Sequence, residues 1–455
     1  MRTDAEDYMV LTFSESEYSN RQSAFLDQLP SNSLVLIPSN GLSVRSNDVT
    51  YPYRPNSYLM YLSGWMENEG VFVATSSKSG LWNTMLFVPP RDTEKEIWEG
   101  IRTGVEGAKN WPVDHTFSLE KLEHKLTGYI NKSKNVYSFL GVNQRLDKFL
   151  TERVVRALGR TLLDPRPILN QMRLTKSQRE IELMTNAAEI ASAAHIVAMK
   201  ATHPGIGEWQ IQSLIEGYFM NERSQWSYPS IVGGGDNATI LHYKSNDSVV
   251  NDGDLVLVDA GCEVEGYASD ITRTWPVGGK FTEPQREIYE LVLKAQLVGI
   301  EACQVGAPWK NIHEETSNVL AQGLIDLGIL DCSLEEALGN RVIQPWGIEF
   351  DGPHRNFFMH GTGHLLGLDV HDVGGGRKGD KHPPAPDLEE GMVLTIEPGL
   401  YFGSWRSDVE IPKKYAGIGV RIEDDVLITK DGPVVLTANC PKQISELESI
   451  IGQEG

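Results

Sequence analysis

Short apolar runs alternate with amphipathic stretches in the first part of the chain. Residues 33–38, 71–74 and 84–88 are apolar runs with the length and composition typical of strands. Residues 17–29 and 118–130 instead have the pattern of helices. This alternation predicts an α/β domain at the amino-terminal end of the chain.

A helix-breaking connector follows at residues 164–167, which read Asp-Pro-Arg-Pro. Two overlapping capping boxes come next, and they predict the start of a long amphipathic helix that runs to about Lys200. The boxes pair Thr175 with Gln178 and Ser177 with Glu180. We therefore predict one domain over residues 1–174 and a second domain over residues 175–455.

The second domain mixes helices with β segments that are punctuated by glycine. Helical patterns cover residues 207–223, 284–304 and 309–327. The β segments between them do not follow a regular βαβ order, so we predict an α+β fold that is preceded by the smaller α/β domain. Residues 374–380 are rich in glycine and predict a mobile loop.

Composition narrows the classes of partner and compartment. The formal net charge is −21 at pH 7, whereas nucleic acids and anionic membranes bind surfaces rich in Lys and Arg, so we expect neither as a partner. No apolar run is long enough to span a bilayer, and residues 1–7 lack the apolar segment of a signal peptide. The four cysteines are scattered, which is typical of a reducing compartment. We expect a cytoplasmic protein, or a mitochondrial one if a presequence has been removed.

Four acidic residues stand where the apolar pattern predicts burial. Asp259, Glu397 and Glu423 each end or interrupt an apolar run, and Asp270 lies just beyond the turn-rich residues 261–266. Carboxylates are costly to bury unless they are paired or hold a metal, and several in one place repel each other. One or two divalent cations are the simplest way to hold these side chains together.

Asp259 and Asp270 are predicted to lie on the two strands of a hairpin over residues 254–274. If residues 264–265 form a two-residue turn, Asp259 faces Asp270 directly across the hairpin. A three-residue loop with a bulge at Gly266 would slip the register by one residue. Both registers stay open, and both put the two carboxylates within reach of one cation.

Four of the 11 histidines fall between His354 and His371. Imidazole is the commonest metal ligand and the usual proton carrier at neutral pH. His360 and His364 have the spacing of a zincin helix, but the glutamate of His-Glu-x-x-His is missing and glycines replace good helix formers. We therefore exclude a zincin, and the glycines suit a close backbone approach at a site.

Two further acids close the set of candidates. Glu397 is followed by Pro398 and Gly399, which predict that a strand ends there and presents the carboxylate. Glu423 lies two residues after Arg421, so the two side chains are predicted to share a strand face. Arg421 could simply neutralise Glu423 as a buried ion pair, and this alternative stays open.

Taken together, these residues resemble the pita-bread family of dinuclear metallopeptidases. The match is the ordered set Asp259, Asp270, His364, Glu397 and Glu423, with support from residues 240–243, 252–261, 266–274, 364–374 and 397–401. The details are most similar to the aminopeptidase P subfamily, and residues 51–57 and 62–65 share that similarity. The segment 343–355 and the region after Gly374 depart from the family pattern.

The resemblance implies a metal-dependent exopeptidase that hydrolyses the amino-terminal Xaa-Pro bond of peptides. It implies two divalent ions, Mn²⁺ first and Zn²⁺ or Co²⁺ as alternatives, that are bridged by Asp270 and Glu423. Asp259 would complete one metal site, and His364 and Glu397 would complete the other. A hydroxide between the ions would be the nucleophile, and Glu397 would also pass its proton to the leaving nitrogen.

The resemblance also assigns roles in the handling of the substrate. His371 would hydrogen-bond the scissile carbonyl, His242 would contact the substrate near the scissile bond, and His360 would line the proline pocket. Arg421 would hold carboxylates behind the metals, and Tyr401 would hydrogen-bond near them.

Other activities within the family stay open at this point. The alternatives are a prolidase that is restricted to dipeptides, an organophosphate-hydrolysing relative, and a processing aminopeptidase that does not require proline. A non-catalytic interaction module is a remote alternative, because such relatives have lost ligands that are all present here. The resemblance also implies a homodimer or homotetramer, with contacts from the amino-terminal domain.

Overall fold

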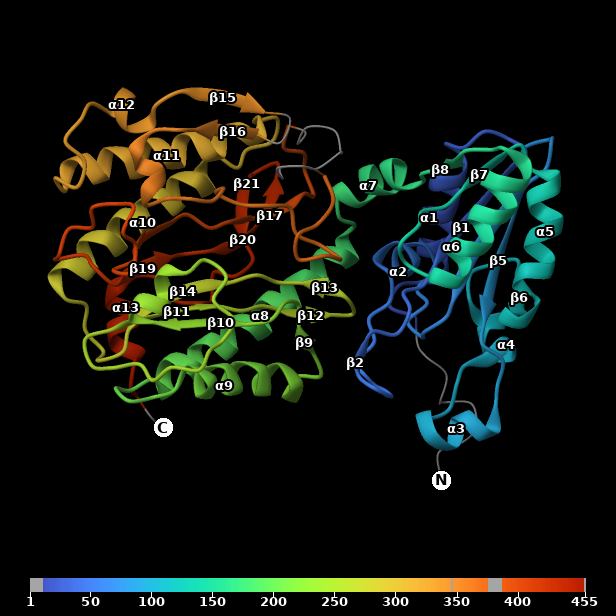
Figure 1. Ribbon diagram of the computed structural model, residues 1–455, viewed down its shortest axis with the longest axis horizontal. Helices are drawn as coiled ribbons and strands as arrows, with labels where there is room; N and C mark the ends of the chain where they lie inside the picture. The colour runs from blue at the N-terminus through green and yellow to red at the C-terminus, as the bar shows by residue number, and fades with distance from the viewer. Residues whose placement is uncertain (1–10, 345–346, 375–386, 454–455) are drawn as a thin grey trace. The chain divides into compact units, whose positions relative to one another are not determined.

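The computed structural model describes residues 11–344, 347–374 and 387–453 (Figure 1). The chain forms two compact units, Met1–Met172 and Arg173–Gly455. The predicted mobile loop lies outside the described residues from residue 375 onward. Residues 1–7 and residues 345–346 of the divergent segment 343–355 also lie outside them.

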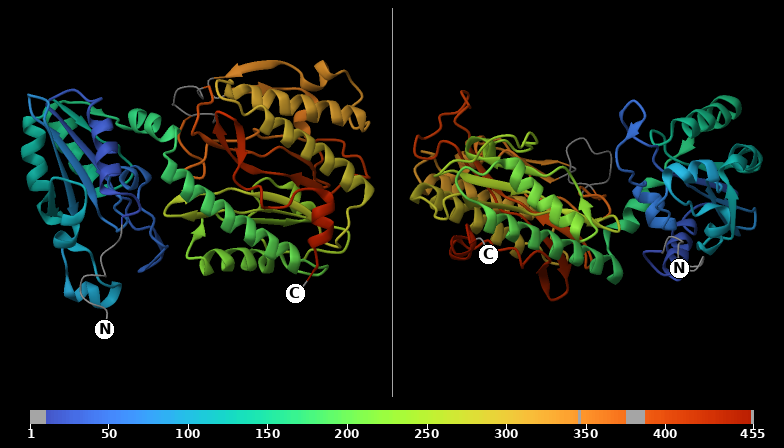
Figure 2. Two further views of the ribbon diagram at one scale, coloured as in Figure 1. Left: turned by 180° about the vertical axis from the view of Figure 1, so that it is seen from behind. Right: turned by 90° about the horizontal axis from the view of Figure 1, so that it is seen from below.

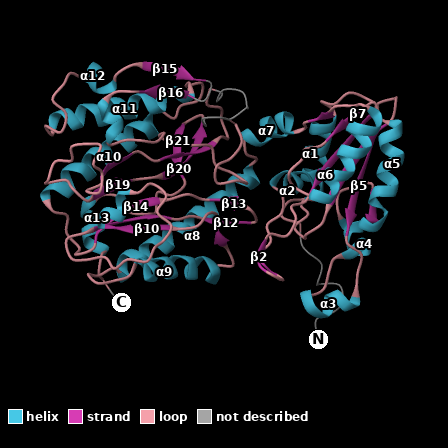
Figure 3. Cartoon of the chain, in the orientation of Figure 1, coloured by secondary structure: helices cyan, strands magenta, loops and turns pink. Residues whose placement is uncertain are grey.

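The first unit combines a sheet with helices (Figure 3). The sheet has six strands in the order β6-β5-β4-β1-β7-β8. Its strands are β1 Ser33–Pro38, β4 Val71–Ser76, β5 Trp82–Val88, β6 His115–Ser118, β7 Asn135–Tyr137 and β8 Leu162–Leu163. Strand β4 is antiparallel to β1 and β5, whereas the pairs β1–β7, β5–β6 and β7–β8 are parallel. The three predicted strands are therefore confirmed. A separate pair joins β2 Val44–Ser46 to β3 Val49–Thr50.

Helices complete the first unit. They are α1 Glu15–Leu26, α2 Ser57–Ser63, α3 Thr93–Glu99, α4 Gly104–Gly107, α5 Leu122–Lys132 and α6 Gln144–Leu150, with the short turns η1 Ala108–Asn110, η2 Leu119–Lys121 and η3 Thr151–Arg156. Leu122 and Leu126 of α5 share one core with Leu34 and Leu36 of β1. Helix α7 Arg166–Leu174 starts inside the connector that was predicted only to break a helix, since proline is tolerated in a first helical turn.

The second unit begins with α8 Gln178–Ala201, close to the predicted bounds. The capping box of Ser177 and Glu180 is present, and Ser177 N donates to Glu180 Oε2 at 2.8 Å. The other predicted helices appear as α9 Glu208–Asn221, α10 Glu283–Glu301 and α11 Trp309–Asp326. Shorter helical segments are α12 Leu334–Leu338, α13 Ile444–Ile450, η4 Gly235–Thr239 and η5 Pro353–Asn356.

Small sheets of two or three strands lie beside these helices (Figure 2). Their orders are β10-β11-β14, β13-β12-β9, β17-β20-β21, β18-β19 and β15-β16. The strands are β9 Gln225–Trp226, β10 Ile231–Gly234, β11 Leu255–Asp259, β12 Cys262–Val264, β13 Tyr267–Ala268, β14 Thr272–Pro276, β15 Arg341–Gln344, β16 Gly347–Phe350, β17 Val393–Ile396, β18 Gly399–Phe402, β19 Ile418–Arg421, β20 Asp424–Thr429 and β21 Gly432–Val435. Side chains of α8, α9 and α10 share one core with β11 and β14.

The register of the predicted hairpin was wrong in both of its forms. The turn that joins β12 to β13 consists of Glu265 and Gly266, and Asp259 pairs with Thr272 rather than with Asp270. Glu265 has φ 52° and Gly266 has φ 84°, and a two-residue turn with both φ angles positive matches the twist of a hairpin. The first predicted register put the turn at residues 264–265, and the second put three residues into the loop, whereas the observed turn has two residues and ends at Gly266. Asp270 consequently lies between β13 and β14, outside the paired strands.

The described residues also bear on three expectations from the sequence, which concern a zincin helix, disulfide bonds and membrane-spanning helices. Residues 357–374 contain no helix, which confirms that His360 and His364 do not form a zincin helix. All four cysteines are free thiols. Among the described helices, none has the length and apolar character needed to cross a membrane.

Candidate metal centre

Three acidic side chains stand at or next to the ends of strands in the second unit, and a fourth, Asp270, lies in the connection between β13 and β14. Asp259 is the last residue of β11, Glu397 directly follows β17, and Glu423 lies between β19 and β20. The strand end that was predicted at Glu397 is confirmed. The backbone N–H of Glu423 donates to Thr272 O at 3.0 Å, so the β19–β20 turn is attached to the start of β14, close to Asp270.

Asp270, His364 and Glu423 gather around one point. Each offers a ligand atom, and these atoms all lie within 4.8 Å of one another. His364 Nε2 lies 3.4 Å from Asp270 Oδ2 and 3.8 Å from Glu397 Oε1. One imidazole nitrogen with several carboxylate oxygens is a suitable donor set for divalent ions of the first transition row. Three of the predicted ligands are thus together, and Glu397 adjoins them through His364.

The raised pKa values of the acidic side chains also indicate a metal site. Burial, followed by the nearby charge of Asp259, raises the pKa of Asp270 well above its ordinary value. Burial, followed by Asp270, raises the pKa of Glu423 in the same way, and burial with Glu423 raises the pKa of Glu397. These carboxylates are unfavourable as a group of bare anions. A divalent cation would remove the repulsion, so both the donor atoms and the charges fit a metal.

A cavity of about 340 Å³ is lined by nine of the ten predicted site residues. They are His242, Asp259, Asp270, His360, His364, His371, Glu397, Arg421 and Glu423. The tenth, Tyr401, is fully buried, and its hydroxyl lies 2.7 Å from His360 Nε2. The structure therefore brings residues from distant parts of the sequence to one surface.

A hydrogen-bond chain connects Arg421 to the wall of this cavity. Arg421 Nη1 donates to Tyr401 Oη at 3.0 Å, and Arg421 Nη2 donates to Asp259 Oδ2 at 2.7 Å. Burial lowers the pKa of His360 to about 3, so its ring is neutral and can accept the Tyr401 hydroxyl proton at Nε2. Strand β19 ends at Arg421, so the predicted shared strand face with Glu423 is wrong. The ion pair of Arg421 is formed with Asp259.

The two remaining histidines reach the cavity from different segments. His371 packs its ring edge-on against His364, with 4.3 Å between the ring centroids. His242 follows η4, and burial lowers its pKa. Both side chains line the cavity beside the predicted metal ligands.

Sequence reasoning missed three polar residues at this site. The Tyr228 hydroxyl lies 2.6 Å from Asp259 Oδ1 and 2.5 Å from Asp270 Oδ1. Thr272 Oγ1 donates to Glu423 Oε2 at 2.7 Å, and the backbone N–H of Asp270 donates to both carboxylate oxygens of Asp425 at 3.2 Å. Thr272 and Asp425 each stand two residues after a predicted ligand, which is a signal that could have found them. Tyr228 is far along the chain from both of its partners and carries no such signal.

Two family profiles match separate parts of this chain. The profile of Metallopeptidase family M24 matches residues 182–430, and that of the aminopeptidase P N-terminal domain matches residues 18–137. The chain belongs to metallopeptidase family M24. This membership implies divalent metal ions, and the cluster of Asp270, His364 and Glu423 is a candidate place for them. The second unit has the pita-bread fold, and the aminopeptidase P N-terminal domain precedes it.

Sequence alignments with relatives cover nearly the whole length of this M24 chain. The Xaa-Pro aminopeptidase of Haemophilus influenzae is 41% identical over 439 residues, which cover 96% of this chain and 97% of that protein. The Xaa-Pro aminopeptidase of Escherichia coli K12 is 39% identical over 449 residues, with 96% and 98% covered. The structure of zinc-substituted E. coli aminopeptidase P in complex with product has a TM-score of 0.88 at 38% identity, with 96% and 98% covered. The predicted resemblance to aminopeptidase P is therefore confirmed.

Proposed function

We propose that this protein is a metal-dependent Xaa-Pro aminopeptidase, which releases the first residue of peptides that have proline in second position. The observation that carries the proposal is the convergence of Asp270, His364 and Glu423 beside Glu397 in one cavity. Membership of family M24 and the Xaa-Pro aminopeptidase relatives support metal-dependent exopeptidase activity.

The proposed metal content is two divalent ions, with Mn²⁺ as the native metal. Asp259, Asp270, His364, Glu397 and Glu423 would hold them, and all five line the cavity. When bound, the ions would activate a water molecule as the nucleophile and stabilise negative charge on the reacting carbonyl. The orientation of Asp259 is supported by Arg421 and Tyr228, which contact its two carboxylate oxygens.

Glu397 is proposed to move the proton during hydrolysis. Its Oε1 lies 3.8 Å from His364 Nε2, and its Oε2 lies 3.8 Å from His360 Nδ1. A carboxylate in this position can take a proton from the attacking water and return it to the leaving nitrogen. His371 would donate a hydrogen bond to the carbonyl oxygen as charge develops there.

Glu397→Gln tests this proton transfer separately from metal binding. Proton transfer by a positioned side chain contributes about 100-fold to 10000-fold in rate, so we expect kcat to fall by at least about 100-fold with metal still bound. The check is kcat together with the metal content of the same sample. Full activity with both ions bound would contradict the proton role while the metal site could still stand.

Specificity for proline has a physical basis in this cavity. An Xaa-Pro bond lacks the N–H that extended-backbone peptidases grip, and its ring fixes the local backbone. Recognition must therefore rest on the shape of the pocket. His360 is neutral and hydrogen-bonded to buried Tyr401, and His242 lines the same cavity, so the two histidines would form the wall that contacts the proline ring.

Substrate profiling after metal removal tests the function. The purified protein is treated with chelator and then supplied with Mn²⁺, and it is offered Xaa-Pro-Xaa, Xaa-Pro and Xaa-Ala-Xaa peptides. We expect Mn²⁺-dependent release of the first residue from the Xaa-Pro-Xaa tripeptide. Activity only on Xaa-Pro would indicate a prolidase, and equal activity on Xaa-Ala-Xaa would indicate a processing aminopeptidase. No metal-dependent release from any peptide would overturn the proposal.

The assembly and compartment follow from the family resemblance as proposals of their own. We expect a homodimer or homotetramer in the cytoplasm. Sedimentation equilibrium of the purified chain measures the first, and a mass that corresponds to one chain would contradict it. Fractionation of the source cells measures the second.

A further inference from the structure

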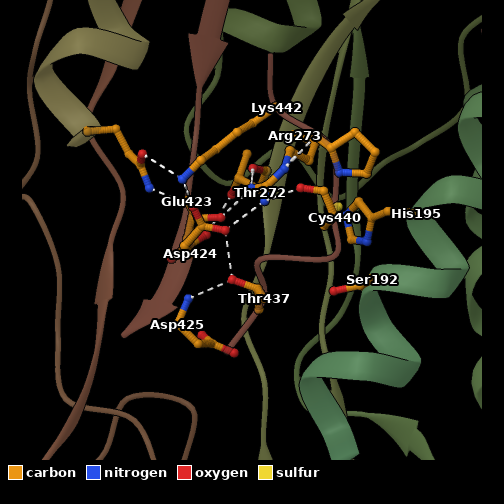
Figure 4. Close-up of polar contacts among 12 residues, drawn as sticks. Ser192, His195, Thr272, Arg273, Glu423, Asp424, Asp425, Thr437, Cys440 and Lys442 are labelled. Carbon is orange, nitrogen blue, oxygen red and sulfur yellow. Dashed lines mark hydrogen bonds and ion pairs between the residues drawn. The ribbon is translucent and has the colours of Figure 1, made fainter. Parts of the chain in front are cut away.

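A buried cluster of polar side chains lies next to Glu423 and contacts its backbone (Figure 4). Arg273 from β14 and Asp424 at the start of β20 form an ion pair at 2.6 Å, and both side chains are completely buried. Gln296, Thr437 and Lys442 complete what we call the arginine cluster. An ion pair is costly to bury unless every remaining donor and acceptor is satisfied.

Arg273 uses all five of its N–H groups in this cluster. Its Nε donates to Pro441 O at 3.0 Å, Nη1 to Thr272 O at 3.0 Å and to Glu423 O at 2.5 Å, and Nη2 to Asp424 Oδ1 at 2.6 Å and to Cys440 O at 2.9 Å. A guanidinium group has five donors in a rigid planar arrangement. Arg273 therefore fixes three segments of backbone relative to one another: the start of β14, the turn at Glu423, and residues 440–441.

Asp424 is saturated from the other side. Besides Arg273, its carboxylate accepts from Thr437 Oγ1 at 2.7 Å, from Gln296 Nε2 at 2.7 Å and from Lys442 Nζ at 2.5 Å. Two of these four partners, Arg273 and Lys442, are cations, so the buried carboxylate is compensated by opposite charge. The carboxylate is thus a fixed negative charge that keeps the guanidinium in place.

Residues 272 and 273 hold three polar groups of Glu423. Its N–H donates to Thr272 O at 3.0 Å, its C=O accepts from Arg273 Nη1, and its carboxylate Oε2 accepts from Thr272 Oγ1 at 2.7 Å. The peptide groups on both sides of the Cα atom are therefore fixed. This leaves the side chain little freedom to move away from Asp270.

We propose that Arg273 and Asp424 are positioning residues, which hold the Glu423 backbone so that its carboxylate stays beside Asp270 at the metal centre. The inference rests on the proposed metal site. It adds that the buried charges of Arg273 and Asp424 keep one of the metal ligands in position. Residues that hydrogen-bond to a metal ligand and orient it typically cost about 10-fold to 100-fold in metal affinity or activity when they are replaced. A purely structural role for the cluster predicts lower stability with unchanged metal affinity.

Asp424→Asn is the primary test, because it keeps the shape of the side chain and removes the charge opposite Arg273. We measure the Kd for Mn²⁺ by titrating metal-free, folded protein, and we measure unfolding on the same samples. The expected result is a folded variant whose Mn²⁺ affinity is about 10-fold to 100-fold weaker. Thr437→Val, which removes one of the donors to Asp424, is the milder variant and should weaken affinity several-fold.

Tyr289→Phe is the matched control. The Tyr289 hydroxyl is buried beside the cluster, and among the described residues its hydrogen bond goes to Lys442 O at 2.7 Å rather than to Glu423 or Asp424. This variant should lose stability while it keeps the Mn²⁺ affinity of the wild type. The control therefore separates a general loss of packing from a loss of ligand position.

Two outcomes would overturn the inference. Folded Asp424→Asn with wild-type Mn²⁺ affinity would do so, and if that variant does not fold, wild-type affinity in Thr437→Val would do the same. An equally large loss of Mn²⁺ affinity in Tyr289→Phe would also overturn it, because the weaker binding of the cluster variants would then follow from general destabilisation. Failure of the wild-type protein to bind Mn²⁺ is a different result, because it would remove the proposed metal site and this inference together.

Discussion

The acidic half and the histidine half of the candidate metal centre are positioned in different ways. The acidic half comprises Asp259, Asp270 and Glu423, which belong to strands or adjoin them, and Asp259 pairs with Thr272 in the β11–β14 ladder. The histidine half is the segment of residues 357–374. Among the described residues, this segment contains no helix and only the isolated bridge of Leu365 with Leu394.

The histidine half is held instead by close backbone contacts and by buried charge. A side-chain Cβ at Gly363 would lie 1.9 Å from Thr395 O, and Thr395 N donates to His364 O at 2.8 Å. Asp372, next to His371, pairs with Arg173 Nη2 at 2.6 Å and with Lys176 Nζ at 3.1 Å. A regular ladder thus fixes Asp259, and Asp270 and Glu423 lie in short connections between strands, whereas the histidines depend on individual contacts outside any strand.

Asp270→Asn should have the largest effect, because it removes a carboxylate from the centre of the acidic half. We expect loss of bound metal and a fall in kcat/KM on the order of 1000-fold or more. Metal content and kcat/KM on an Xaa-Pro-Xaa peptide measure this. Asp408→Asn is the matched control, since Asp408 pairs with Arg406 and its side chain is 66% exposed. Retention of metal and activity in Asp270→Asn would contradict the assignment of the acidic half.

Asp372→Asn tests the buried charge behind the histidine half. Its side chain is 2% exposed, and its removal would leave Arg173 and Lys176 without this partner. Breaking a buried ion pair costs about 3–5 kcal/mol, which denaturant unfolding would measure. Glu123→Gln is the surface comparison, because its partner Arg145 is 79% exposed, and it should change stability by less than about 1 kcal/mol. If the two substitutions lowered the free energy of unfolding equally, the buried ion pairs of Asp372 would not stabilise the histidine half as proposed.

Gly363→Ala and Gly361→Ala form a pair that tests close backbone approach. The added methyl group would clash with Thr395 O at Gly363, whereas no atom lies within 4 Å at Gly361. We expect a loss of about 1–3 kcal/mol at Gly363 and a smaller change at Gly361. Unfolding curves and the Mn²⁺ Kd of both variants give the comparison. Similar results at the two positions would contradict the role of the Gly363–Thr395 contact.

His195 on α8 affects the dependence of stability on pH. Burial lowers the pKa of His195 to about 4, from an ordinary value of 6.5. The unfolded chain therefore binds more protons than the folded one in this window, so stability falls as the pH is lowered from 6.5 toward 4. His195→Gln should flatten that fall by about 1–3 kcal/mol. An unchanged pH slope of the unfolding free energy would show that His195 does not contribute.

The comparison also explains what could be predicted from the sequence. The apolar runs that end at Asp259, Glu397 and Glu423 indicated strand ends, and β11, β17 and β19 are close to those runs. The hairpin register was wrong because it depends on which two residues adopt positive φ, and Glu265 is not a residue for which this is expected. Strand patterns carry information about burial, but turn geometry decides the register.

The contacts that orient the ligands were the least predictable part. The pairing of Arg421 with Asp259 joins residues 162 positions apart, and Tyr228 lies 31 and 42 positions from its two partners. No local pattern specifies such long-range pairs. The histidine segment was found by residue type and resemblance alone, because its conformation follows from tertiary contacts such as that of Gly363 with Thr395.

The central claim is that this cavity hydrolyses Xaa-Pro peptides with two divalent ions held by the acidic half, the histidine half and Glu397 together. The most direct measurement is a titration of metal-free protein with Mn²⁺, in which bound metal and the rate of first-residue release from an Xaa-Pro-Xaa peptide are followed in parallel. We predict that the rate rises with bound metal and saturates at two ions per chain. Full peptidase activity in the metal-free protein, or binding of two ions without any release of the first residue, would contradict the claim.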